Sequence, residues 1–535
     1  GELHGGWKLI TAQLNHERLG LGSWSDKIFG PYKRVLDWAK ARDENGHRAI
    51  DLPWVRRLLA DCYTRMEAMR LINFRIAADL EKGSMDVALA SATKVYGSES
   101  VIKVLRNLIE IVGHSALRRV VMGADAVGNE ADPAQLDAMV ALLHESILAG
   151  GIGFSSTASN SHSDHQGSPV PSRFATRDEF LRLATAAGQH DGTTLEFISS
   201  AGATFTEAEM ELMADMSAAA DRPLNWNVMV VNSDPSARAG RENKLSASDI
   251  AAARGGRVVG LCLPEPMRMR LCFASGFVLD MLPGIKEFIH LPHAERRAAF
   301  ADAANRALIA QAVSVLPETN TLSKFGRFRI IDAQTPEVRA LVGRTIGEIA
   351  AERGQSDIDT LFDIVVADDL QTGLEPPIIG ADDDAWAERV RILDTDPRVI
   401  AGGSDAGAHL DMMKTFACHT SFMAEAVRGR QLMSVERAVQ LFTDAPARFY
   451  GLRHRGRVTE GWIADLCVFD PATIGPGTIE PRADLPAGGW RLYSEATGIA
   501  STIVNGVEIV RDGVVTGDTP GRTIRSGRDT DTVRA

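Results

Sequence analysis

The sequence predicts an α/β fold in which parallel strands alternate with helices, preceded by an all-α segment and followed by a small β unit. Three observations lead to this prediction. A helical pattern fills residues 1–111, short β-like runs then alternate with Ala-rich helical stretches, and alternating strands broken at Asn-Gly and Asp-Gly follow. The chain has 535 residues. This is several times the about 100–150 residues that usually share one hydrophobic core, so we expect two or three folding units.

Composition excludes several classes of protein. The content of 45% hydrophobic residues indicates a globular chain. Its net charge of −12 disfavours nucleic acid as a partner, because nucleic-acid-binding domains usually carry a basic face. The apolar runs fall short of the roughly 20 residues that span a bilayer, and no signal peptide is recognisable, so no membrane is expected. The chain begins at Gly1 instead of Met, which suggests a piece of a longer reading frame. The cysteines form no CxxC pair and fit a reducing, cytoplasmic location: Cys62, Cys262, Cys272, Cys418 and Cys467.

The first segment, residues 1–111, is helical in pattern. Asp51 and Pro53 supply a capping carboxylate and an early-turn proline, and the helix they open ends near Gly83. Two more helices are expected over 7–41 and 84–112, which together predict an antiparallel bundle. The central helix carries apolar residues three and four apart: Val55, Leu58, Leu59, Cys62, Met66 and Met69.

The second segment, residues 112–455, alternates strands with helices such as 133–148 and 207–219. This βα alternation predicts a parallel sheet, and a barrel if enough units are present. Roughly five or six units can be counted where a closed barrel needs eight. The candidate strands are 151–155, 194–198, 224–228, 258–262 and 399–403.

The end of the chain changes texture again. Residues 456–518 hold short alternating strands, at 456–470 and 503–513, and we expect a small β unit. Residues 519–535 are rich in Arg, Gly, Asp and Thr, and we expect a frayed, flexible tail.

Residues 1–111 resemble the C-terminal helical domain of acyl-CoA dehydrogenases. The resemblance rests on Gly1-Glu-Leu-His-Gly-Gly-Trp-Lys-Leu-Ile-Thr11, Leu14-Asn-His-Glu-Arg-Leu-Gly-Leu-Gly22, Asp51-Leu-Pro-Trp-Val-Arg-Arg57 and Ala90-Ser-Ala-Thr-Lys94.

This resemblance implies a bundle that packs against FAD and a neighbouring subunit, and so an oligomer formed through the N-terminal helices. Arg42 stands roughly where the family places a flavin-phosphate arginine, or is a solvated helix-end charge. The domains that supply most of the flavin and acyl-CoA site are absent from the sequence.

Residues 112–515 resemble the amidohydrolase superfamily, in its N-acyl-D-amino-acid deacylase (D-aminoacylase) branch. The motifs are Val112-Gly-His-Ser-Ala-Leu-Arg-Arg-Val-Val-Met-Gly123, Ser161-His-Ser-Asp-His-Gln-Gly-Ser-Pro-Val-Pro171, Gly402-Gly-Ser-Asp-Ala-Gly-Ala-His409 and Arg455-Gly-Arg-Val-Thr-Glu-Gly-Trp-Ile-Ala-Asp-Leu-Cys-Val-Phe-Asp470.

The resemblance implies an incomplete (β/α)8 TIM-type barrel whose first strands are missing, with a small flanking β-sandwich remnant. It implies hydrolysis of a linear, non-peptide C–N amide bond in a small-molecule substrate, with zinc or another divalent metal as cofactor.

Asp405 is the residue expected to carry the chemistry. It follows an apolar strand and a Gly-Gly-Ser turn, where a carboxylate can bind a metal, take a proton from water and deliver it to the leaving amine. Taken without the resemblance, an Asp in such a turn more often bonds the backbone. His114 is a second candidate metal ligand, and Ser404, His409 and His162 are candidate substrate-binding residues.

The expected metal site lacks part of its ligand set. No His-x-His motif occurs in the chain, and the strand at 224–228 carries asparagines where the deacylases commonly place a histidine. Glu196 lies inside an apolar strand and requires a partner or a metal. Two His-x-x-His pairs are transition-metal pairs or loop-bracing side chains: His162 with His165, and His290 with His293.

The two resemblances leave three alternative hypotheses for the function of the chain. The first is a metal-dependent amidohydrolase, impaired if the missing motif is essential. The second is a non-catalytic fusion remnant or assembly module. The third is an acyl-CoA-dehydrogenase-type flavin oxidoreductase subunit that a partner chain completes.

Overall fold

The structure is a computed structural model, and it divides into two compact units, Gly1–Ala116 and Leu117–Ala535. The described residues are 32–33, 35–37, 39–40, 48–51, 53–81, 113–163, 167–200, 202–276, 278–316, 320–404, 410–485 and 490–535.

The described part of the first unit is dominated by helix α3 (Pro53–Glu81), preceded by the short 3-10 helix η2 (Ala49–Asp51). The helix begins at the predicted proline, which suits the first turn because that position needs no backbone donor. Leu59, Cys62 and Met66 are at most 5% exposed and lie three or four residues apart, so the predicted apolar stripe is confirmed at these three positions. The helix predicted over 84–112 lies outside the described residues.

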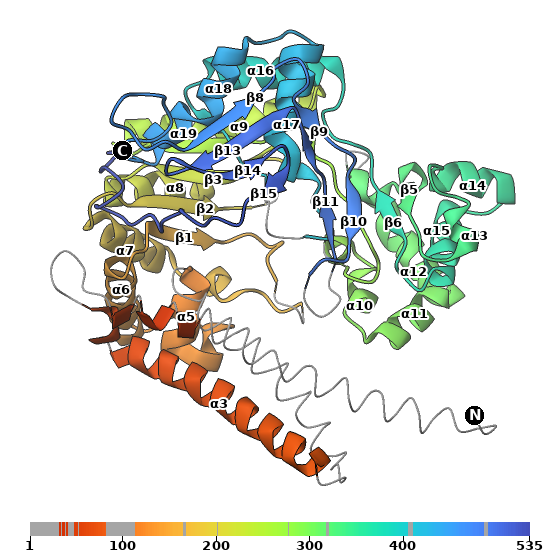
Figure 1. Cartoon of the computed structure of the whole chain (residues 1–535). Helices are drawn as coiled ribbons and strands as arrows, with labels where there is room; N and C mark the ends of the chain where they lie inside the picture. The colour runs from red at the N-terminus through yellow and green to blue at the C-terminus, as the bar shows by residue number, and fades with distance from the viewer. Residues whose placement is uncertain are drawn as a thin grey trace. The chain divides into compact units, whose positions relative to one another are not determined.

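The second unit is built on a five-stranded parallel sheet in the order β1-β2-β3-β4-β7. Figure 1 labels its first three strands, β1, β2 and β3. Each strand overlaps one of the five predicted from the sequence, so the parallel sheet is confirmed. The strands are β1 (Gly153–Thr157), β2 (Thr194–Ile198), β3 (Leu224–Met229), β4 (Val258–Cys262) and β7 (Val399–Ala401).

Helices connect the first four strands, and their starts are specified locally. Asp132 and Thr206 each form a capping box with the residue three positions later, which satisfies backbone donors at the helix start. Helix α6 (Pro133–Leu148) precedes β1, and the connecting helices are α7 (Arg177–Gly188), α8 (Glu207–Ala220) and α9 (Pro235–Ala253).

Strand pleating separates two faces of this sheet. Leu195, Phe197, Leu224 and Trp226 are fully buried and belong to the same core as apolar residues of α7 and α8. Because successive side chains alternate, the residues between them point to the opposite face. We call Glu196, Asn225 and Asn227 the polar face.

Residues between β4 and β7, with Met412 and Met413 beyond β7, form a second apolar core that the sequence did not predict. It contains an antiparallel pair, β5 (Arg329–Asp332) with β6 (Gly373–Glu375), instead of further parallel strands. Within the described residues the parallel sheet therefore has five strands, and the incomplete barrel stays a prediction. The helices of eight or more residues in this region are α11 (His293–Ala301), α12 (Ala303–Ser314), α14 (Ile346–Arg353), α15 (Asp357–Ala367) and α16 (Asp383–Thr395).

The predicted C-terminal β unit is a four-stranded antiparallel sheet, ordered β15-β14-β13-β8. Asn505-Gly506 and Asp512-Gly513 turn its two hairpins with positive φ, as type I′ turns require. The strands are β8 (Leu466–Phe469), β13 (Ile499–Val504), β14 (Val507–Arg511) and β15 (Val514–Val515).

The prediction of a frayed tail over 519–535 is wrong for its last residues. Thr530 is 2% exposed, and its hydroxyl donates to the carbonyl oxygen of Gly192 at 2.7 Å. The Asp531 amide donates to the Gly451 carbonyl oxygen at 2.7 Å. A Cβ at Gly192 would lie 2.1 Å from the Thr530 hydroxyl oxygen. The tail can therefore dock here only because residue 192 is a glycine and has no side chain.

Among the helices in the described ranges, none combines the length and apolarity that crossing a bilayer requires.

Candidate functional site

The candidate site lies at the carboxyl edge of the parallel sheet. Strands β1, β2, β3, β4 and β7 run parallel, so their carboxyl ends meet at one edge (Figure 1). This is the edge at which α/β proteins commonly place their sites.

Ser404 follows β7 at this edge, three residues after Ala401. Its carbonyl oxygen accepts a hydrogen bond from the Thr415 hydroxyl, which ties the segment to the chain beyond it. Gly403 has φ 81°, and a Cβ there would lie 2.6 Å from Val228, so the turn before Asp405 requires glycine. Asp405 and His409 lie outside the described residues, and their roles stay predictions.

The polar face joins two strands through side-chain hydrogen bonds. The Asn227 amide donates to a Glu196 carboxylate oxygen at 2.6 Å, and the Tyr450 hydroxyl donates to the Asn225 side-chain oxygen at 3.2 Å. Burial, followed by the negative charge of Glu196, raises the pKa of Tyr450. The phenol therefore stays protonated and acts as a donor at neutral pH.

Two polar atoms of this face remain without a partner. The Asn225 side-chain nitrogen and the Asn227 side-chain oxygen are buried and make no hydrogen bond in the described part of the chain. Buried polar atoms without partners are costly and uncommon. One is a donor and the other an acceptor, two positions apart on the same face of β3, so together they match the two polar ends of an amide group.

The described residues do not fit a zinc centre. The searched ranges hold no group of three His, Cys, Asp or Glu side chains close enough to share an ion. On the polar face, an Asn227 amide hydrogen occupies one oxygen of the only carboxylate, Glu196, and asparagine is a poor zinc ligand. His114 is the first residue of α5 (His114–Met122), is 1% exposed and belongs to the first unit. Its metal role stays a prediction.

The other predicted histidines take up separate positions. His162 is half-buried, and its carbonyl oxygen accepts from the Val170 amide at 3.3 Å, while His165 lies outside the described residues. His290 lies 3.8 Å from the Asp280 carboxylate and His293 lies 3.8 Å from that of Asp369.

These contacts favour the loop-bracing interpretation of His290 and His293. Asp280 is next to Leu279, a residue of the second apolar core, and the His290 ring lies against Gly167, where a Cβ would approach Nε2 to 2.8 Å, so His290 braces the loop that follows β1. The substrate-binding role of His162 stays a prediction.

Glu265 is a candidate that sequence analysis missed. It lies three residues beyond β4 and is 5% exposed, and one carboxylate oxygen has no hydrogen-bond partner among the described groups. Burial raises its pKa to about 7, against the opposing effects of Ser421 and Arg268. The signal that could have found it is a glutamate between two prolines directly after an apolar strand.

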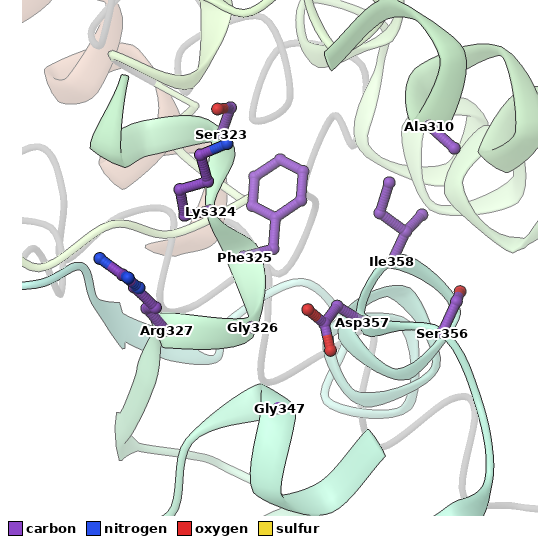
Figure 2. Close-up of a pocket in the computed structure, with 10 residues that line it drawn as sticks. All are labelled: Ala310, Ser323, Lys324, Phe325, Gly326, Arg327, Gly347, Ser356, Asp357 and Ile358. Carbon is purple, nitrogen blue, oxygen red and sulfur yellow. The ribbon is translucent and has the colours of Figure 1, made fainter. Parts of the chain in front are cut away.

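A cavity of about 590 Å³ opens beside the second core. Figure 2 shows Lys324 and Arg327 on one side, the Asp357 carboxylate directed toward Gly326, and the Phe325 ring above them. A Cβ at Gly326 would lie 2.1 Å from an Asp357 oxygen, so this approach needs glycine. No residue predicted for the site lines this cavity, which is therefore distinct from the carboxyl edge.

The fold and the polar strand edge define an α/β protein with its candidate site at the carboxyl ends of parallel strands. The chain belongs to the amidohydrolase family, whose model matches residues 105–510. D-aminoacylase of Alcaligenes xylosoxydans xylosoxydans is 30% identical over 34% of this chain and 34% of its own length. An uncharacterized protein of Mycobacterium tuberculosis is 26% identical over 79% of this chain and 71% of its own.

The N-terminal residues have a second relationship. Residues 4–134 match the model of the acyl-CoA dehydrogenase C-terminal domain. The acyl-CoA dehydrogenase FadE26 of Mycobacterium tuberculosis is 41% identical over 22% of this chain and 30% of its own length. Both resemblances are confirmed. The chain spans about a third or less of the first curated relatives it matches, and Arg42 lies outside the described residues.

Solved structures give the same neighbours. A crystal structure of D-aminoacylase is 22% identical, covers 77% of this chain and 70% of its own, and aligns with a TM-score of 0.45. N-acyl-D-glutamate deacylase of Bordetella bronchiseptica, solved with zinc and a phosphonate inhibitor, is 19% identical over 79% and 71% with a TM-score of 0.42.

Proposed function

We propose that this chain hydrolyses a linear C–N amide bond of an N-acyl amino acid, with the D-enantiomer preferred. Membership of the amidohydrolase family supports a hydrolase of this kind. The D-aminoacylase relative supports the acyl amino acid as substrate class.

The unpaired donor and acceptor of Asn225 and Asn227 carry the proposal. In this proposal the substrate displaces the groups that cover these two buried atoms; the Asn225 nitrogen then donates to the carbonyl oxygen of the substrate amide, and the Asn227 oxygen accepts from its N–H. Glu196 holds the Asn227 amide through the 2.6 Å hydrogen bond, and Tyr450 holds Asn225 in the same way. The substrate would thus be bound across β3 and oriented by side chains fixed by their neighbours.

Asp405 acts as the general base. It accepts a proton from the attacking water and delivers it to the leaving amine, so the C–N bond breaks to a carboxylic acid and an amine. A divalent metal enters this proposal only through the relatives, one of which is solved with zinc. Since the described donors do not fit that ion, no step is assigned to it.

Release of free amine from N-acetyl-D-glutamate and its L-enantiomer tests the proposal. The full chain would be assayed as purified, after chelation, and with zinc restored. We expect amine release with the D-enantiomer and a loss of about 100-fold or more in Asp405→Asn, the scale of a lost general base. Asp178→Asn, an exposed helix-start carboxylate, is the matched control and should change little. Equal rates in Asp405→Asn and the native chain would remove Asp405 from the mechanism.

A non-catalytic role is the second candidate. The observation that favours it is the Asn227–Glu196 hydrogen bond, which occupies a carboxylate oxygen of the polar face. In this case the chain binds its amide ligand without turnover, and the N-terminal helices mediate assembly. Saturable amide binding by a cooperatively folded chain that releases no amine, with or without zinc, would establish this role over hydrolysis.

A further inference from the structure

A second cavity, of about 560 Å³, lies within the second unit between a helical segment and the C-terminal sheet. The helices are α17 (Cys418–Phe422), the π-helix η9 (Met423–Gly429) and α18 (Val435–Phe442). The volume falls within the about 300–1,000 Å³ of small-molecule sites, and π-helical turns are rare and frequent near such sites. No residue of the polar face or of the predicted site lines it.

The cavity wall is mainly apolar. Phe442, Phe469 and Ile499 are only partly buried, because one side of each packs on the main core and another side faces the cavity. Exposed apolar surface gathered in a concave site gains free energy when an apolar ligand covers it. The apolar side chains of the wall are Met423, Val439, Phe442, Leu466, Phe469, Ile474 and Ile499.

His419 supplies one polar group with a defined direction. Its Nδ1 lies 3.6 Å from the Cys418 sulfur. Burial, with the charge of Glu265, raises the pKa of Cys418 to about 12, so the sulfur is a protonated thiol. In the tautomer in which this thiol donates to Nδ1, the ring proton sits on Nε2 and makes it a donor, and we adopt this tautomer in the proposal below. The side chains packed around the ring lower the pKa of His419 by desolvation, which keeps the imidazole neutral, although the residue as a whole is exposed at the cavity.

All but one of the charged residues that line the cavity are already in ion pairs. Both Arg457 and Arg448 contact the Asp444 carboxylate, and Arg455 contacts that of Asp465. The remaining carboxylate of the lining, Glu436, is exposed on α18. A charged ligand would have to compete with these pairs, whereas a neutral ligand would not.

We propose that this cavity is a binding site for a neutral aliphatic molecule that carries a carbonyl group, such as a fatty amide. The His419 Nε2–H donates to the carbonyl oxygen. The alkyl chain lies against the apolar wall formed by Phe442, Phe469 and Ile499. The cavity shares no lining residue with the polar face, so ligand binding here does not depend on the proposed hydrolysis.

Cys467 is a built-in reporter for the test. It lines the cavity and is exposed, whereas the other four free cysteines are buried. The rate at which N-ethylmaleimide alkylates Cys467 in the full chain would be followed by mass spectrometry, with butanamide, hexanamide or octanamide added. We expect saturable protection, with an affinity that rises about fourfold for each added methylene. Octanoate, which has the same chain and a negative charge, should protect at least tenfold less well.

Two variants distinguish the site from a general surface effect. Val439→Trp fills the cavity and should abolish protection by octanamide, while Val515→Trp, placed on an exposed position of β15, should leave it intact. His419→Phe keeps the ring packing and removes the donor, so affinity should fall about three- to tenfold.

Four outcomes would overturn the proposal. The first is alkylation unaffected by any amide, and the second is protection by octanoate equal to that by octanamide. The third is octanamide protection that survives Val439→Trp. Alkylation that slows with protein concentration alone would indicate that a second copy fills the cavity, which also contradicts a small-molecule site.

Discussion

Removing the buried ion pair between Arg118 and Glu179 should destabilise the second unit strongly. The two side chains are 0% and 1% exposed, and an Arg118 nitrogen donates to a carboxylate oxygen at 2.7 Å. Arg118 also donates to the Asn129 carbonyl oxygen at 2.5 Å, so Glu179→Ala leaves its guanidinium fixed, buried and uncompensated. Loss of one partner of such a pair costs about 3–5 kcal/mol.

Urea denaturation followed by tryptophan fluorescence measures this cost. With a urea dependence of about 3 kcal/mol per molar, the midpoint for Glu179→Ala should fall by roughly 1 M or more. Asp137→Ala is the matched control, because it removes an exposed partner of Arg182 and should cost at most about 1 kcal/mol. Replacing Arg118 and Glu179 together by methionine should recover most of the loss. A Glu179→Ala midpoint no lower than that of Asp137→Ala would refute the reasoning.

Three further predictions concern stability. Burial raises the folded-state pKa of Glu265 from 4.5 to about 7. The protonated carboxyl therefore contributes to the free energy of unfolding, fully below pH 4.5, and this contribution is lost as the pH rises through 7. Urea unfolding should give a free energy of unfolding about 3 kcal/mol lower at pH 8 than at pH 4.5 from this group, and Glu265→Gln should lack this difference. An identical pH profile in the native chain and in Glu265→Gln would contradict the prediction. Gly260→Ala should cost about 1–3 kcal/mol, because the new Cβ would lie 2.8 Å from Trp226, and an unchanged melting temperature would show that the ring can move. Thr530→Val should cost about 1 kcal/mol by removing the hydrogen bond to Gly192, and unchanged protease resistance of the tail would count against its docking.

The sheet and its helices could be predicted because local sequence determines them. Strands β2 and β4 match the predicted ranges. Apolar residues alternate along β2, and β4 is a short apolar run that lies between a Gly-Gly pair and a proline. Helix α6 also matches, because Asp132 and Pro133 mark its start. The Asn-Gly and Asp-Gly turns likewise specified the terminal hairpins.

What the sequence did not show depends on contacts between distant residues. The hydrogen bond from Tyr450 to Asn225 joins positions 225 residues apart, so no local pattern reveals it. The docked tail depends on Gly192 and Gly451, whose bare backbones become informative only when the tail lies against them. The second core was missed because its short helices and antiparallel strands resemble the βα alternation around them.

Hydrolysis in water enriched in oxygen-18 tests the central claim most directly. The claim is that water attacks the acyl carbon and the C–N bond breaks, so the carboxylic acid released from N-acetyl-D-glutamate should gain one heavy oxygen and the amine none. Asp405→Asn should form little labelled acid over the same time. If the purified chain yields no labelled acid, with or without zinc, it is not an amide hydrolase for this substrate class, and the non-catalytic role takes its place.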